Sequence, residues 1–130
     1  MILPAALLAL MLGAGPTSAQ SQPEVSVADR GAELRGLDRV SGALTEIEIA
    51  NGETVAYGGL EITLSECRYP TESPASDAFA HLMIREKGQA QALFDGWMIA
   101  SSPALMALDH PRYDVWLIRC KTSEGVAGAD

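Results

Sequence analysis

Basic side chains are scarce in this chain of 130 residues. Nine Lys and Arg residues stand against seventeen Asp and Glu residues, which gives a formal net charge of −8. Proteins that bind nucleic acid or anionic lipid surfaces need clusters of basic side chains. The sequence therefore predicts no nucleic-acid partner, and it argues against an anionic membrane surface as the partner.

The chain also lacks an apolar run long enough to span a bilayer. Its longest run, ILPAALLALML at residues 2–12, has about half of the roughly 20 residues that a membrane helix needs. Small and turn-forming residues follow, as they do at the cleavage site of a secretory signal peptide. We therefore expect residues 1–19 to be a cleaved signal peptide and the mature, periplasmic protein to start at Gln20. An uncleaved membrane anchor is the alternative.

Cysteine is limited to Cys67 and Cys120. In an exported protein an even pair of cysteines indicates a disulfide bond, whereas in a reducing compartment the same pair would be free thiols. A metal site with His81 and His110 is a further alternative, but none of the four residues stands at a CxxC or HxxxH spacing. We predict a Cys67–Cys120 disulfide, no metal site and no cofactor.

The polar stretches at both ends of the mature chain show no clear period. We expect residues 20–31 to be a flexible lead and residues 122–130 a flexible tail. Between them, residues 32–121 show the alternation of apolar and polar side chains that is typical of half-buried strands. The sequence predicts a single all-β domain there, a small antiparallel sandwich or barrel of six or seven short strands.

For two segments, simple alternation does not decide which face of the sheet is buried. Strict alternation in LEITLSECRY would put Cys67 on the polar face, so a buried disulfide needs either a bulge near Glu66 or a strand covered on both faces. The segment YDVWLIRC, residues 113–120, is apolar on both faces, which predicts a central strand that is covered on both sides.

One short helix is expected in SSPALMALDHP. Ser102 suits the N-cap and Pro103 the first helical position, while Pro111 would end the helix, because the residue before a proline leaves the helical region. The sequence predicts a helical insert of about two turns near the C-terminus.

The same region holds the residue types of a hydrolase. Ser101, Ser102, Asp109, His110 and Asp114 lie close together in the sequence, and a serine hydrolase needs a serine, a histidine and a carboxylate. No GxSxG motif presents the serine, however, and a capping serine already uses its hydroxyl group. The sequence therefore favours a protein without enzymatic activity, with a hydrolase using His110 and Asp109 or Asp114 as the alternative.

Aromatic residues make up only 5% of the chain, so the two tryptophans stand out. Trp97 and Trp116 are expected in the core, with a bulge at Gly96 that turns the first ring inward, although they could also form a binding platform. A small-ligand carrier with a pocket lined by Trp97, Trp116 and Met98 is a further hypothesis. His81, which lies among apolar neighbours, is expected at a core edge.

Four segments together resemble a bacterial family known as domain of unknown function 2155: GLDRVSGALTEIEI, GGLEITLSECRYP, AFAHLMI and FDGWMIASSPALMALDHPRYDVWLIRC. The residues that carry the resemblance are Leu37, Asp38, Cys67, Gly96, Trp97, Met98, Ala100 to Leu105, His110, Pro111, Tyr113 to Trp116, and Cys120. It covers about residues 33–121. The family looks like small exported proteins, mostly from alphaproteobacteria, so the resemblance supports export and paired cysteines but implies no activity. The leading hypothesis is a periplasmic β-rich domain that binds another envelope protein or an envelope component.

Overall fold

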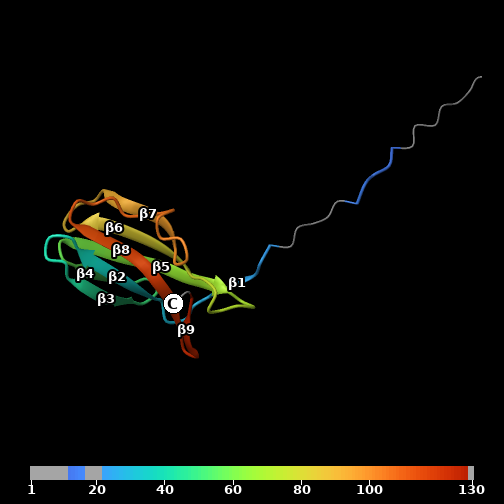
Figure 1. Ribbon diagram of the computed structural model, residues 1–130, viewed down its shortest axis with the longest axis horizontal. Helices are drawn as coiled ribbons and strands as arrows, with labels where there is room; N and C mark the ends of the chain where they lie inside the picture. Colours follow the sequence, from blue (N-terminus) through green and yellow to red (C-terminus); the bar gives the residue numbers. More distant parts are fainter. Residues whose placement is uncertain (1–11, 17–21, 129–130) are drawn as a thin grey trace, which may run out of the picture.

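All regular structure in the described residues, 12–16 and 22–128 of the computed structural model, is β-structure. The strands there are β1 (Val25–Val27), β2 (Ala32–Asp38), β3 (Leu44–Ile49), β4 (Thr54–Tyr57), β5 (Leu60–Pro70), β6 (Phe79–Glu86), β7 (Ala92–Ile99), β8 (Tyr113–Thr122) and β9 (Gly125–Ala127). They form two antiparallel sheets that stack on each other, with β7 and β3 at opposite sides of the molecule (Figure 1). The all-β prediction is confirmed, and of its two forms the structure shows the sandwich.

The longest strand, β5, organises the first sheet. Its neighbours follow the order β1-β5-β6-β7, and β4 pairs with the other half of the β5 edge that β1 occupies. The second sheet has the order β3-β2-β8-β9. Strand β7 is therefore an edge of the first sheet, and β3 is an edge of the second.

One core fills the space between the sheets. Alternate residues of β5 and β6 point inward, as the period of two predicts. The largest side chains that are fully removed from solvent are Leu34, Ile49, Leu60, Ile62, Leu64, Leu82, Ile84, Met98, Val115 and Leu117. At roughly 2 kcal/mol for each buried aliphatic side chain, this core is the main favourable contribution to folding.

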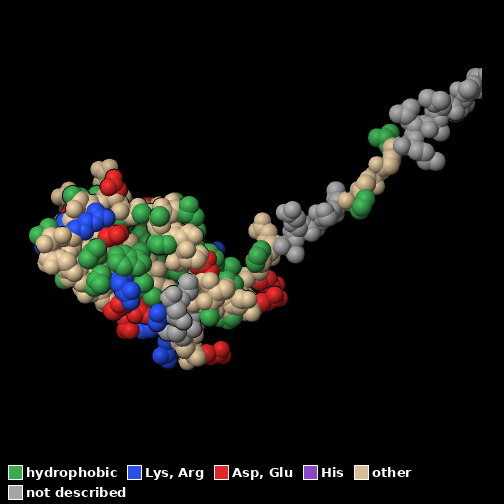
Figure 2. Space-filling model, viewed as in Figure 1, with side chains coloured by type: hydrophobic (Ala, Val, Ile, Leu, Met, Phe, Trp, Pro, Cys, Tyr) green, Lys and Arg blue, Asp and Glu red, His purple; other side chains and the backbone are tan. Residues whose placement is uncertain are grey.

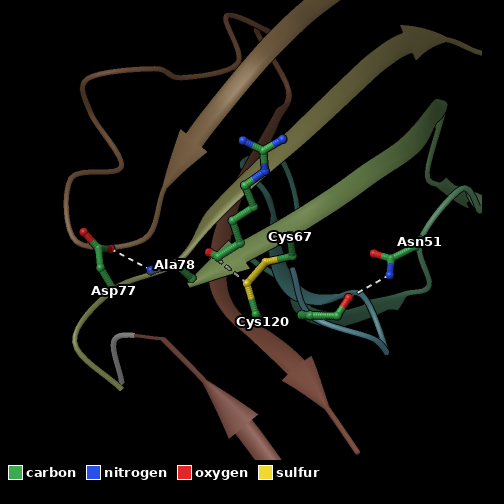
Figure 3. The surroundings of a disulfide bond; sticks show 7 residues. Asn51, Cys67, Asp77, Ala78 and Cys120 are labelled. Carbon is green, nitrogen blue, oxygen red and sulfur yellow. Dashed lines mark hydrogen bonds between the residues drawn. A yellow bond between two sulfur atoms is a disulfide. The ribbon is translucent and has the colours of Figure 1, made fainter. Parts of the chain in front are cut away.

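Two β-bulges bring the cysteines into this core. The register of β5 shifts between Leu64 and Glu66, and that of β8 shifts opposite Glu33 and Leu34 of β2, which makes Ile118 the extra residue. Each extra residue reverses the alternation, so Cys67 and Cys120 both point inward and are fully buried. Their disulfide, with a Cα–Cα distance of 5.6 Å, links the two sheets (Figure 3). The predicted pairing and the bulge alternative are both confirmed.

The predicted helical insert is wrong. Residues 100–112 form an irregular connection from β7 to β8, and the N–H of Leu105 donates to the carbonyl of Ser102 in a single turn (3.1 Å). The two prolines that bracket this segment leave room for fewer residues than an isolated helix needs. Leu108 is drawn into the core instead, and the Met106 side chain reaches the inner side of Gly96.

The expected flexible lead and tail each contain a short strand. Strand β1 pairs with β5, and Ala28 behind it is fully buried with its N–H donating to the carbonyl of Cys67 (2.8 Å). Strand β9 pairs with β8. Residues 1–11, 17–21 and 129–130 lie outside the described residues, and with them most of the expected signal peptide. Within the described ranges, no helix has the length and apolarity needed to cross a bilayer.

Candidate functional site

His110 is held through both of its ring nitrogens. Its Nδ1 accepts hydrogen bonds from the backbone N–H groups of Arg112 (3.0 Å) and Tyr113 (3.1 Å). A nitrogen that accepts from two amides carries no proton, so the proton is on Nε2, which donates to Oε1 of Glu86 (2.6 Å). Only 11% of the His110 side chain is exposed, and its hydrogen bonds shape the turn that leads into β8.

The carboxylates that were expected to assist His110 lie elsewhere. Asp114 faces the guanidinium of Arg39 at 3.7 Å, and Asp109 is exposed. Glu86, at the end of β6, takes the place beside the imidazole. Since Glu86 is separated from His110 by 24 residues, local sequence patterns gave no signal for this pair.

The structure also separates the serines from the histidine. The Ser101 hydroxyl donates to Asp77 Oδ2 (2.6 Å), and Asp77 lies just before β6, whereas the Glu86 partner of His110 ends that strand. An eight-residue strand spans about 25 Å, so Ser101 and His110 are tied to opposite ends of β6. The backbone carbonyl of Ser102 accepts a hydrogen bond from the N–H of Leu105. The geometry brings no serine, histidine and acid of this region together as a triad.

A second ion pair fixes the same end of β8. The Arg112 guanidinium binds both carboxylate oxygens of Asp38 (3.0 to 3.3 Å), and Asp38 Oδ1 also accepts from the N–H groups of Val40 and Ser41. The hydrogen bond from Arg112 and those two amides hold the pKa of Asp38 at about 2, below its usual 3.8. This contact joins the end of β2 to the residue just before β8.

The contacts of Tyr113 show why the fold needs a tyrosine just after the His-Pro pair. Its ring packs beside the His110 ring (5.3 Å between centroids) and edge-on to Tyr57 (5.4 Å), and its hydroxyl accepts from the N–H of Gly59 (3.3 Å). A Cβ atom on Gly58 would lie 2.4 Å from that hydroxyl oxygen. We name this set, His110, Glu86, Arg112, Asp38 and Tyr113, the His110 corner. It stabilises the fold, with Pro111 at its exposed bend.

Neither tryptophan is in the core, which corrects the expectation for both. On β7 the side chains of Phe94 and Met98 point inward, so the period of two turns Trp97 to the outer face, where it is half-buried. The predicted bulge at Gly96 is wrong, because the bulge of β7 lies at the start of the strand. The missing side chain of Gly96 leaves room for the Met106 side chain instead. In the sequence Trp97 and Met98 are both apolar, so the pattern could not decide which of them faces the core.

The outer face of the first sheet carries a second cluster of apolar and aromatic side chains. Val25, Arg68, Phe79, Trp97 and Ile99, from four adjacent strands, line a shallow hollow of about 310 Å³, and we name this surface the Trp97 face. The Arg68 guanidinium lies over the Trp97 ring at 4.7 Å from its centroid. Such a cation–π contact contributes about 0.5–1 kcal/mol at an exposed site.

Polar side chains frame the Trp97 face. The His81 ring packs edge-on to Trp97 (5.2 Å), its Nδ1 lies 3.0 Å from the Ser65 hydroxyl, and its Nε2 lies 3.5 Å from Asp95. Arg68 also binds Glu66 (2.7 Å), and this hydrogen bond lowers the pKa of the Glu66 carboxyl. His81 therefore lies on the surface, beside the aromatic cluster.

A groove of about 400 Å³ lies between the 100–112 connection and β8. Its lining consists of Arg39, Pro103, Ala104, Ala107, Leu108, Asp114, Val115 and Trp116. Trp116 therefore belongs to the second sheet, whereas Trp97 is on the outside of the first and Met98 is buried between the sheets. The three residues do not share a pocket, so the carrier hypothesis loses its proposed binding site.

Among the described residues, no three His, Cys, Asp or Glu side chains are grouped so as to hold a metal ion. On the face of the molecule shown in Figure 2, hydrophobic side chains lie between basic and acidic ones. The apolar surface on this face is therefore broken by charges of both signs.

Comparisons with known proteins agree with the resemblance seen in the sequence. A family model described as "Uncharacterized protein conserved in bacteria (DUF2155)" matches residues 32–120. The curated "Uncharacterized protein RP359" of Rickettsia prowazekii (strain Madrid E) is 28% identical over 91 residues, which are 68% of this chain and 59% of that protein. The chain thus spans less than two thirds of the length of this relative. No solved structure matches the chain.

Proposed function

The chain belongs to the DUF2155 family of bacterial proteins, and from that premise we propose that it is an exported, non-enzymatic binding domain of the cell envelope whose contact surface is the Trp97 face. The observation that carries the proposal is the position of Trp97. A core tryptophan would serve the fold alone, whereas this one lies on an outer sheet face beside Arg68, Phe79 and Ile99. Tryptophan and arginine are enriched among the residues that dominate binding energy in protein interfaces.

The surroundings of the Trp97 face extend its apolar surface. On β1, Val25 is 47% and Val27 54% exposed, and Val25 lines the hollow together with Trp97. Single exposed apolar residues are ordinary, but a contiguous apolar patch with a charged rim is typical of a protein contact. Glu66 and Asp95 supply part of that rim.

Two further observations support the other parts of the proposal. The buried disulfide favours an oxidising compartment such as the periplasm, because such bonds are rare in the cytosol. Both nitrogens of His110 are engaged in hydrogen bonds that shape a turn, so no ring nitrogen is left to take a proton from a nucleophile. A role without catalysis is consistent with this arrangement.

Site-specific photocrosslinking in intact cells tests the contact surface. A photoreactive amino acid at Val25, beside the Trp97 face, should yield a discrete adduct, whereas the same group at the exposed Thr45 of β3 should not. Trp97→Ala, which leaves the core unchanged, should abolish the adduct without a loss of folded protein. Equal adducts from both positions, or an adduct that Trp97→Ala leaves unchanged, would contradict the proposed surface.

Export has a separate test. Cell fractionation should place the protein in the periplasm, and N-terminal sequencing of that material should begin at Gln20. A full-length protein that stays in the cytoplasm would refute export and leave the surface proposal to its own experiment.

A further inference from the structure

Strand β7 is a long edge strand with little charge, and its β-bulge lies at its start, before Asp95. Within the described residues no strand pairs with its outer side, it is eight residues long, and Asp95 is its single charged residue. The edge strand β3 carries Glu46 and Glu48 in ion pairs with Arg35 and Lys121. Strands β1, β4 and β9 have only three or four residues. Natural proteins protect edges by such charges or by short length, so β7 stands out as an edge that is open to pairing.

The hydrogen-bond pattern shows which backbone groups face this edge. The N–H of Ala100 donates to the carbonyl of Ala78 (2.9 Å), and in an antiparallel ladder every second residue bonds to the same neighbour. Phe94, Gly96 and Met98 therefore direct their backbone N–H and C=O groups toward β6. The residues between them, Asp95, Trp97 and Ile99, direct their N–H and C=O groups away from β6.

The connection from β7 to β8 does not use up these groups. The N–H of Ser102 donates to the Ile99 carbonyl (3.1 Å). Among the described residues, residues 100–112 make no backbone hydrogen bond to Asp95 or Trp97. The edge thus retains the N–H and C=O groups of Asp95 and Trp97 and the N–H group of Ile99.

The same three residues place their side chains on the outer face of the sheet. Trp97 and Ile99 belong to the Trp97 face, and the Asp95 carboxylate, with 54% of its side chain exposed, faces His81 there. A strand added to β7 would bond to their backbone and lay every second side chain beside Trp97 and Ile99. Addition of a strand to an open sheet edge is a recurring mode of peptide recognition.

Resting on the proposed function, we infer that the partner binds as an extended segment that adds to β7 as the next strand of the first sheet. The segment has apolar residues at alternate positions, which lie against Trp97 and Ile99. It has Lys or Arg opposite Asp95, since cross-strand pairs of opposite charge stabilise a sheet and the whole chain carries a net charge of −8.

A matched pair of variants tests this mode of binding. Asp95→Pro removes the N–H that faces the open edge and keeps the pairing with β6, because an edge strand tolerates proline where its N–H points to solvent. Asp95→Ala removes the carboxylate and keeps the N–H. Thermal unfolding of both variants should first show that they fold like the unmodified protein.

The probe is a capped eight-residue peptide that presents two valines and one lysine on one face, to lie opposite Ile99, Trp97 and Asp95, with threonine at the other positions. Its binding to the unmodified protein should slow amide hydrogen exchange at Asp95 and Trp97 about tenfold or more, and Asp95→Pro should weaken binding about tenfold beyond Asp95→Ala. The same peptide with N-methyl groups on alternate amides has the same charge and should not protect β7. Equal binding of the methylated peptide, or of the two variants, would overturn the inference.

The crosslinking experiment separates this inference from the proposed function. If Asp95→Pro leaves the Val25 adduct intact while Trp97→Ala removes it, the partner docks on the Trp97 face without strand pairing, and only the inference fails. If neither variant affects the adduct, both fail. A dimer of the unmodified protein that Asp95→Pro dissociates in sedimentation would identify the occupant as a second copy of the chain, and it would overturn the assignment of a partner segment.

Discussion

Removal of the disulfide should cost this domain a large part of its stability. Cys67 and Cys120 are separated by 53 residues, and the chain-entropy relation gives about 4 kcal/mol for a loop of that length. Replacing both with alanine also deletes two fully buried sulfur atoms, which adds about 1 kcal/mol for each cavity. The total of about 6 kcal/mol compares with about 5–15 kcal/mol for the whole stability of a typical protein.

Equilibrium urea unfolding of Cys67→Ala/Cys120→Ala, followed by tryptophan fluorescence, measures this loss. The variant Cys67→Val/Cys120→Ala is the matched control, because its valine refills part of the cavity while the crosslink stays absent. At slopes of about 1–3 kcal/mol for each M of urea, which are typical of small domains, the loss of the crosslink alone should lower the urea midpoint of this control by about 1.3–4 M. A control midpoint within about 0.5 M of the unmodified protein would show that the loop-closure argument does not apply to this chain.

Three further substitutions test the packing and the electrostatics of the fold. Gly36→Ala should destabilise the domain by about 1–3 kcal/mol in the same urea assay, because its Cβ would lie 2.4 Å from the Tyr57 ring; an unchanged midpoint would show that the ring moves aside freely. Asp38 has a folded-state pKa of about 2 against 3.8 unfolded, so its stabilising effect is complete above about pH 4 and is lost as the pH falls toward 2. Asp38→Asn should therefore flatten the acid limb of a stability–pH curve, and an identical curve would contradict the role of Arg112. His110→Ala should leave two backbone N–H groups without their acceptor and lower stability by about 2 kcal/mol, measured as a lower melting temperature; an unchanged melting temperature would contradict the structural role of the imidazole.

The strands were the most predictable part of the fold, because apolar residues at every second position reflect a physical requirement of a half-buried sheet. The segments 45–49 and 60–65 show this alternation, and both lie in strands. The bulge in β5 followed from combining that alternation with the need to bury Cys67. The matching bulge at Ile118 had no such signal, since Trp116, Ile118 and Cys120 kept a regular apolar pattern without it.

The site was less predictable, because its contacts join distant parts of the chain. Glu86 and Asp38 are ordinary acids in the sequence, and only the packing of β6 and β2 against β8 brings them to His110 and Arg112. Local signals also misled where they competed with tertiary contacts. Ser102 and Pro103 favour the start of a helix, but the burial of Leu108 in the core draws the chain into an open connection.

The segment from β7 to β8 combines two tasks that the structure separates in space. At its end, His110, Arg112, Tyr113 and Cys120 make contacts within the protein that fix the turn and join the sheets. At its beginning, Trp97 turns away from the core, although the inner face of the same strand holds the smaller Met98. A fold alone would gain more from burying the larger ring, at about 25 cal/mol for each Å² of apolar surface removed from water. The position of Trp97, beside backbone groups that still lack a strand, supports the proposal of a surface that a partner strand would complete.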